Sequence, residues 1–157
     1  MNKQLLLGLL LTILPISELR GGLPVVVSYA LQNSLKIWPL FLLVILLNIL
    51  IIFFIYFFLD FLHDKLLKIK FYRRIIEKPL ARLRKKAKRF EEKKQGEFFG
   101  LFLLVAIPLP GTGAWTGCLI SWILGINRKK SILAISLGVL AAGLIILFGS
   151  LGFFSLF

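Results

Sequence analysis

Long apolar runs alternate with short polar breaks along this chain of 157 residues. Two runs, residues 37–59 and 131–157, carry no charge and exceed the about 20 residues that a helix needs to cross a bilayer. The stretches 3–31 and 98–125 are also apolar but are interrupted, at Ser17–Pro24 and at Pro108–Gly113. Each interrupted stretch precedes one uninterrupted run, so the pattern predicts two halves of similar design. Paired breaks of this kind are typical of transporter sites near the bilayer midplane.

Composition excludes a soluble globular protein, because the chain is 59% hydrophobic and has a mean hydropathy of +0.92. The formal net charge is +13, and the positive charge is unevenly placed. Fourteen of the 20 Lys and Arg residues fall in Lys65–Lys94, and Arg128–Lys130 adds three more. Because these clusters lie between membrane segments, we expect them to face the anionic inner leaflet of the cytoplasmic membrane rather than nucleic acid.

The charges also predict the topology. If both interrupted stretches crossed the membrane, the two basic clusters would lie on opposite faces, against the positive-inside rule. If each stretch instead enters and returns on one side, 17 positive charges lie inside, Lys3 and Lys36 lie outside, and Arg20 lies at a hairpin tip. The sequence thus predicts an all-α integral membrane protein, a multi-pass single domain over 1–157. Its parts are a first repeat (1–62), a basic linker (63–97) and an inverted second repeat (98–157), each repeat being a re-entrant helical hairpin followed by a transmembrane helix.

Within the linker, apolar residues recur at helical spacing on one face, with Lys and Arg on the other. This pattern predicts an amphipathic helix on the inner leaflet, and the alternative is a solvated charged loop. The residues of the stripe are Ile76, Leu80, Leu83, Ala87 and Phe90.

The two breaks carry the candidate functional residues. Glu18 and Arg20 are the only ionisable residues expected within the hydrocarbon, where charges face a cavity or each other. Either Glu18 exchanges a proton or contacts substrate while Arg20 binds an anionic head group, or the two merely pin the tip. Helix starts at Pro24 and after Thr112 or Gly113 would aim two helix N-termini at the centre, which favours an anion. The alternative at the second tip is a tight turn without a ligand. The full candidate set is Glu18, Arg20, Gly21, Gly22, Pro24, Pro108, Pro110, Gly111, Thr112, Gly113 and Trp115.

Other residues favour structural roles. Asn48 is expected to hydrogen-bond between helices, and Asp60 to lie at a solvated helix end. Small residues at Ala134, Gly138 and Ala142 predict a close helix contact. With a single Cys and a single His, the chain offers no disulfide, metal site or catalytic triad, so we expect neither an enzyme nor a cofactor.

The segments ISELRGGLP and PLPGTGAWTG together resemble a bacterial and archaeal family, the putative small multi-drug export proteins, which is similar to the DedA/VTT membrane superfamily. The resemblance implies two inverted re-entrant hairpins and movement of lipids between leaflets. Glu18 matches the acidic residue of the superfamily's first hairpin, and Pro110 and Gly111 match its Pro-Gly pair. DedA proteins usually carry arginines at the positions of Ile107 and Gly113, and this chain has none there.

These observations predict a transporter, as a homodimer, that moves a lipid or lipid-linked phosphate between leaflets, with proton coupling as an option. The alternatives are export of small cationic compounds and a non-transporting role in organising the membrane. An Arg20 so close to Glu18 favours an anionic or zwitterionic lipid over a cation.

Overall fold

The computed structural model describes residues 2–66, 94–109 and 111–155, and the regular structure in these ranges is entirely α-helical. Pro110 and most of the basic linker lie outside the described residues, and so does the predicted amphipathic helix. The helices are α1 (Lys3–Ile13), α2 (Glu18–Gln32), α3 (Ile37–Leu66), α5 (Lys94–Ala106), α6 (Ala114–Leu124) and α7 (Arg128–Ser155).

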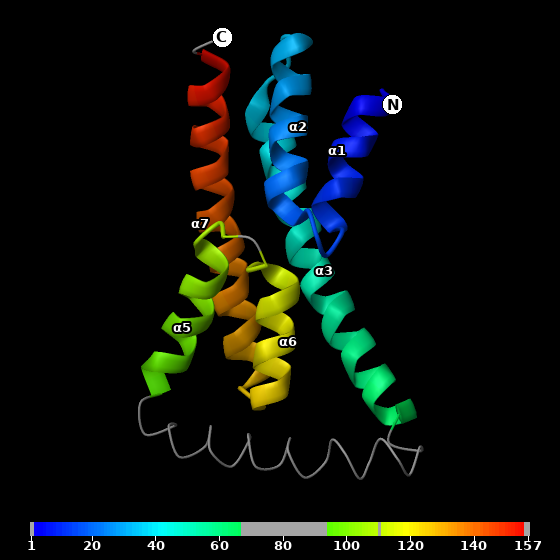
Figure 1. Ribbon diagram of the computed structural model, residues 1–157, viewed down its shortest axis with the longest axis vertical. Helices are drawn as coiled ribbons and strands as arrows, with labels where there is room; N and C mark the ends of the chain where they lie inside the picture. Colours follow the sequence, from blue (N-terminus) through cyan, green and yellow to red (C-terminus); the bar gives the residue numbers. More distant parts are fainter. Residues whose placement is uncertain (1, 67–93, 110, 156–157) are drawn as a thin grey trace.

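Helices α3 and α7 run almost the full length of the molecule (Figure 1). Their segments Ile37–Leu62 and Arg128–Ser155 are helical throughout and are, by length and composition, candidates for the two predicted spans. Large apolar side chains cover their outward faces; Phe57, for example, is 69% exposed. Apolar surface of this extent is stable in contact with lipid rather than water.

The four shorter helices form two hairpins at opposite ends of the molecule (Figure 1). Helices α1 and α2 fill the upper half of the view, next to both chain termini, while α5 and α6 fill the lower half. The second arm of each hairpin, α2 or α6, packs against both α3 and α7. The two hairpin tips therefore meet near the middle of the long axis.

The first break is shorter than the sequence predicts. Helix α2 begins at Glu18 rather than at Pro24, so Gly21, Gly22 and Pro24 lie inside it and the turn comprises only residues 14–17. The prediction of a helix start at Pro24 is wrong because the glycines serve another purpose. A Cβ at Gly22 would collide with the Thr12 side chain and lie 2.6 Å from the Gly8 carbonyl oxygen. Gly22 thus marks a close crossing of α1 and α2, a usual role for small residues in membrane helices.

The second half follows the predictions more closely. Helix α6 begins after Gly113 and ends at Gly125, which adopts a left-handed φ of 71°, as a C-terminal glycine commonly does. On α7 the small-residue face predicted around Gly138 packs against α5. A Cβ at Gly138 would lie 2.7 Å from Cβ of Val105, so glycine sets the distance between these helices.

Candidate functional site

The carboxylate of Glu18 lies against the start of α6. Its Oε1 accepts a hydrogen bond of 3.2 Å from the backbone N–H of Trp115, in the first turn of that helix. First-turn N–H groups have no partner inside a helix and carry partial positive charge, so they bind anions. The sequence predicted an anion at this helix end, and the anion present in the structure is the protein's own Glu18.

The guanidinium of Arg20 also reaches the second hairpin. It donates hydrogen bonds to the backbone carbonyl and to the hydroxyl of Thr112. The Thr112 hydroxyl in turn donates to carbonyl oxygens of the loop that follows α5, at 2.9 Å from both Ile107 and Leu109. Among the described residues, the salt bridge is the one between Arg128 and Asp60, and Glu18 and Arg20 do not form one with each other. Each of these two residues instead binds the tip of the opposite hairpin.

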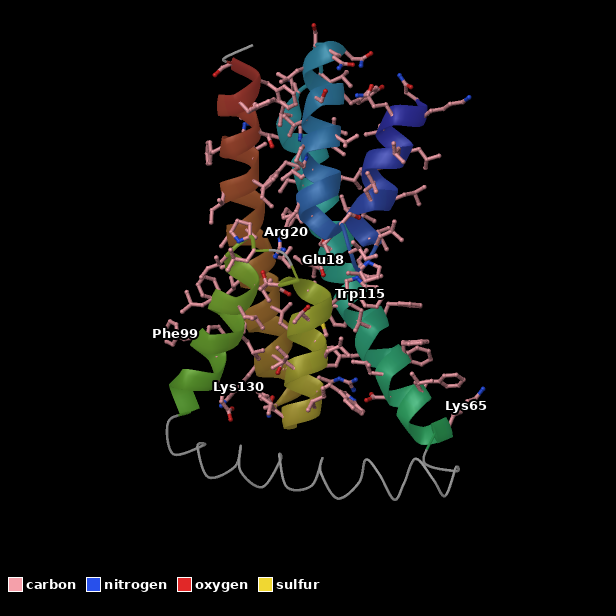
Figure 2. The ribbon with its side chains drawn as sticks, in the orientation of Figure 1. Glu18, Arg20, Lys65, Phe99, Trp115 and Lys130 are labelled. Carbon is pink, nitrogen blue, oxygen red and sulfur yellow. The ribbon has the colours of Figure 1, made fainter. Side chains whose placement is uncertain are left out.

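Trp115 makes a third contact between the tips. Its indole Nε1 donates to the carbonyl oxygen of Ile13 at 3.1 Å. Ile13 is the last residue of α1, and the last carbonyl groups of a helix lack a partner within it. A single residue of the second hairpin therefore donates to the first hairpin twice, once through its backbone and once through its side chain. Figure 2 shows Glu18, Arg20 and Trp115 together near mid-height.

Backbone geometry at both tips is unusual. Gly113 has φ 145° and ψ −164°, a conformation open almost solely to glycine, and Gly111 has φ 79°. A Cβ at Gly113 would also collide with the Glu18 carboxylate, whereas a Cβ at Gly111 would meet nothing within 4 Å. Glu18 itself has φ 44°, which is rare for a residue with a side chain and costs on the order of 1–3 kcal/mol. The contacts between the tips offset this strain.

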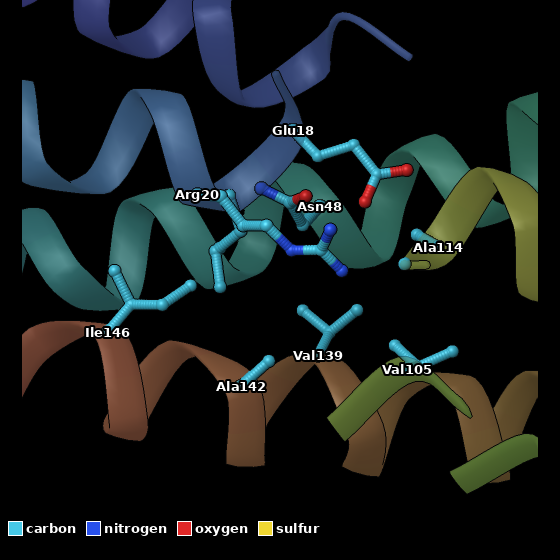
Figure 3. Close-up of a pocket in the computed structure, with 10 residues that line it drawn as sticks. Glu18, Arg20, Asn48, Val105, Ala114, Val139, Ala142 and Ile146 are labelled. Atoms are coloured by element: carbon cyan, nitrogen blue, oxygen red, sulfur yellow. The ribbon is translucent and has the colours of Figure 1, made fainter. Parts of the chain in front are cut away.

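A small cavity borders the tips (Figure 3), with a volume of about 10 Å³. That is on the order of the room for one water molecule, so this cavity has no room for a larger solute. Asn48 of α3 lines the cavity and is only 1% exposed. Its side-chain nitrogen donates to Val44 of the same helix at 3.0 Å. The predicted hydrogen bond between helices is therefore wrong, and its amide faces the site instead.

The structure brings together only part of the predicted set. Glu18, Arg20, Thr112, Gly113 and Trp115 form the junction, and Gly111 shapes its loop. Gly21, Gly22 and Pro24 belong to α2, with Gly22 turned toward α1 rather than the second tip. Pro108 lies half-buried in the tip loop, and Pro110 is outside the described residues.

Two contributors were missed by the sequence interpretation. Asn48 gives a signal, as a lone amide in an apolar helix. Ile13 contributes only a backbone carbonyl, which has no sequence signature. Among the described residues, no group of three or more His, Cys, Asp or Glu side chains is placed to hold a metal ion.

A second polar cluster lies at the far end of α3. The Asp60 carboxylate accepts hydrogen bonds from the indole of Trp122, at 2.9 Å, and from the guanidinium of Arg128, at 2.6 Å. Asp60 was expected at a solvated helix end, but it connects α3 to α6 and α7. The Asp60 side chain is 45% exposed, so the cluster lies at the surface of the bundle.

Two long apolar helices, apolar outward faces and two helix hairpins that meet in the middle define a helical membrane protein. The chain belongs to the family described as putative small multi-drug export protein, whose model matches residues 18–145. The match begins at Glu18, directly after the first turn, and includes Arg20 and the whole second tip. No match was found among curated proteins or among solved structures.

Proposed function

We propose that this protein is a membrane transporter built from two inverted re-entrant hairpins whose tips form a gate at the bilayer midplane. Helix length supports this arrangement. The hairpin arms have 11 to 15 residues, or about 16 to 22 Å at 1.5 Å per residue. Each arm is too short for a hydrocarbon core of about 30 Å, whereas α3 and α7 are long enough.

The distribution of charge supports the orientation. Lys65 and Lys130 lie at the lower end of the molecule, and both chain termini lie at the upper end (Figures 1 and 2). By the positive-inside rule the lower end faces the cytoplasm and the hairpin α1–α2 enters from outside. The two hairpins then enter from opposite faces, as in inverted-repeat transporters.

The contacts between the tips support a gate. Glu18, Arg20 and Trp115 are all partnered across the junction, so opening it leaves each group without its partner. In a region of low dielectric, polar groups separate only when other polar groups replace their partners. A substrate that supplies such groups, or a proton taken up by Glu18, would therefore open the junction.

One observation carries the choice of substrate. The two groups now held by the chain itself, the Arg20 guanidinium and the N-terminus of α6, are both groups that bind phosphate well. A lipid phosphate can take the place of the Glu18 carboxylate at α6 and of Thr112 at Arg20. We therefore propose transfer of a lipid or lipid-linked phosphate between leaflets, with protonation of Glu18 favouring release of α6.

A second candidate, export of small cationic compounds, is favoured by the family description. In this case the Glu18 carboxylate would leave α6 and bind the cation, and Arg20 would hinder it. A role in organising the membrane without transport is the third possibility. The basic linker would then carry the function, and loss of function on deleting residues 78–94, with tolerant tips, would support it.

Purified protein in vesicles tests the choice directly. The probes are a fluorescent phospholipid, a polyprenyl phosphate and a cationic dye, each followed across the bilayer. If phosphate binds at the junction, Arg20→Gln abolishes movement of both lipids, while Lys129→Gln, the same charge change at an exposed site, leaves it intact. The cationic substrate would be assigned instead by two results together. The unaltered protein would move neither lipid, and dye export would survive or rise in Arg20→Gln.

The homodimer is also part of the proposal. Four short arms and two long helices enclose little volume, and the outward faces of α3 and α7 remain apolar. Single-molecule photobleaching in vesicles would count the chains per particle, and a single bleaching step throughout would exclude the dimer.

A further inference from the structure

A groove of about 340 Å³ runs along the outside of the bundle between α3 and α7, away from the hairpin tips. Four of its residues occupy one face of α3 at helical spacing, and two occupy one face of α7, four positions apart. Its upper part is apolar and aromatic, and its lower end carries the polar cluster of Asp60 and Arg128. The lining residues are Phe53, Tyr56, Phe57, Asp60, Arg128 and Ile132.

Arg128 is held in a defined orientation at the mouth of the groove. One of its terminal nitrogens donates to Asp60, and its guanidinium lies 5.0 Å from the centre of the Tyr56 ring. Both oxygens of Asp60 are engaged, one by Arg128 and the other by the Trp122 indole. A guanidinium has five N–H donors in a fixed planar fork, so Arg128 retains donors for a further acceptor. Its side chain is 51% exposed and is accessible from outside.

The geometry points to an anionic-lipid site in this groove, with Arg128 binding the head-group phosphate and Phe53, Phe57 and Ile132 contacting an acyl chain. Charge complementarity supports this occupant: Arg128 carries its positive charge in the groove, and Lys129 and Lys130 follow it in the first turn of α7, against the single charge of Asp60. A phosphate can accept hydrogen bonds from the remaining N–H donors of Arg128 while the Arg128–Asp60 hydrogen bond stays in place. An organic cation would have to displace Arg128 and would meet the repulsion of Lys129 and Lys130.

The groove favours a lipid over free phosphate for two reasons. First, its wall is mainly hydrocarbon: Phe53 is 53% exposed and Phe57 69% exposed, and an acyl chain would cover both. Second, Asp60 and Arg128 lie near the ends of the two candidate spans, Ile37–Leu62 and Arg128–Ser155, so the proposed orientation brings the polar end of the groove close to the lipid phosphates. This inference deepens the proposed function by naming where an anionic lipid is held before transfer. It is tested by binding alone, so failure of transport would not overturn it.

Native mass spectrometry of the full chain in non-ionic detergent measures the binding. Phosphatidylglycerol, phosphatidylcholine with the same acyl chains, and inorganic phosphate are titrated separately. We expect phosphatidylglycerol to bind most tightly and inorganic phosphate to compete poorly. Arg128→Gln should weaken phosphatidylglycerol binding roughly tenfold or more, as expected for loss of a charged hydrogen bond. Arg128→Lys should restore part of the affinity, because the charge remains but the planar fork is lost.

Lys129→Gln is the matched control, because it removes the same charge one residue away without lining the groove. We expect it to change affinity less than about threefold, as for an exposed, screened charge. If Arg128→Gln and Lys129→Gln lose lipid affinity equally, the binding is general electrostatic attraction, and the proposed site is wrong. Equal affinity for the two lipids would overturn it too. Unchanged lipid binding together with tighter binding of a cationic dye in Arg128→Gln would assign the groove to cations. The variants change an exposed side chain, and retained thermal stability shows that each has folded.

Discussion

The carboxylate of Glu18 and the backbone N–H of Trp115, 97 positions apart in the chain, are joined by a hydrogen bond of 3.2 Å. The contact places an acidic side chain of the first hairpin at the positive end of a helix of the second. Arg20 and the Trp115 indole add contacts in both directions between the hairpins. The two tips are therefore held together by polar groups for which a phosphate, a proton or a cation can compete.

Replacement of Glu18 by Gln should leave a protein that inserts and folds but whose transport no longer depends on pH. Gln retains an oxygen that can accept the Trp115 N–H, but it neither carries the charge nor exchanges a proton. The measurement is the initial transport rate in vesicles over a series of pH values. Glu97→Gln, at the start of α5, is the control and should keep the pH profile of the unaltered protein. Full activity with an unchanged profile in Glu18→Gln would give Glu18 a purely structural role.

The two glycines of the second tip should respond differently to alanine. At Gly111 only the positive φ opposes a side chain, so Gly111→Ala should cost about 1–2 kcal/mol of stability. At Gly113 the Cβ also displaces the Glu18 carboxylate, so Gly113→Ala should destabilise more and impair transport more than expression. Thermal unfolding and transport of both variants provide the test. Equal effects would mean that the Glu18 contact contributes nothing beyond backbone conformation.

Apolar run lengths were enough to predict the two spans and the second break. Residues 37–59 and 131–157 contain no charge, and the pattern at Gly113 and Gly125 matches known helix-end preferences. These features are local, so the sequence shows them directly. The small-residue face around Gly138 was predicted for the same reason, since residues four apart share one side of a helix.

The first tip was harder to predict because glycine has two opposite uses. A Gly-Gly pair followed by Pro usually indicates a helix end, yet here Gly22 permits a close approach to α1 and the helix continues through it. Only the partner helix distinguishes the two uses. The sequence also identified Glu18 and Arg20 as candidates but left open whether they pair. Their actual partners, the Trp115 N–H and the Thr112 carbonyl, are backbone groups that any residue possesses.

The crossing of α1 and α2 predicts a stability effect at Gly22. A Cβ there meets backbone and side-chain atoms of α1, so Gly22→Ala should lower the free energy of unfolding by roughly 1–3 kcal/mol, as overpacking commonly does. Gly149→Ala on α7 is the control, since a Cβ there meets nothing within 4 Å, and it should be neutral or slightly stabilising. Thermal denaturation in detergent compares the two. A neutral Gly22→Ala would mean that α1 and α2 are farther apart than described.

The proposed orientation in the membrane predicts which positions are accessible from each side. Asn33 follows α2 at the end with the termini, and Lys129 lies at the basic end of α7. Single cysteines at 33 and 129, each in a Cys118→Ser background, should be labelled by a membrane-impermeant thiol reagent from outside and from inside, respectively. Labelling of both positions from the same side would exclude the re-entrant arrangement.

Cross-linking of the two tips in native membranes tests the account most directly. Cysteines at Ile13 and Trp115, in a Cys118→Ser background, replace two residues that are in contact although 102 positions apart, and they leave Arg20 in place. A short bifunctional thiol reagent should join them with high yield, the cross-linked protein should no longer transport, and reduction of a cleavable linker should restore transport to the level of the unlinked double variant. A pair at Asn33 and Trp115, with one residue far from the junction, should not react. Absence of a cross-link between positions 13 and 115 in a folded protein, or undiminished transport once they are joined, would contradict a central gate formed by the two hairpins.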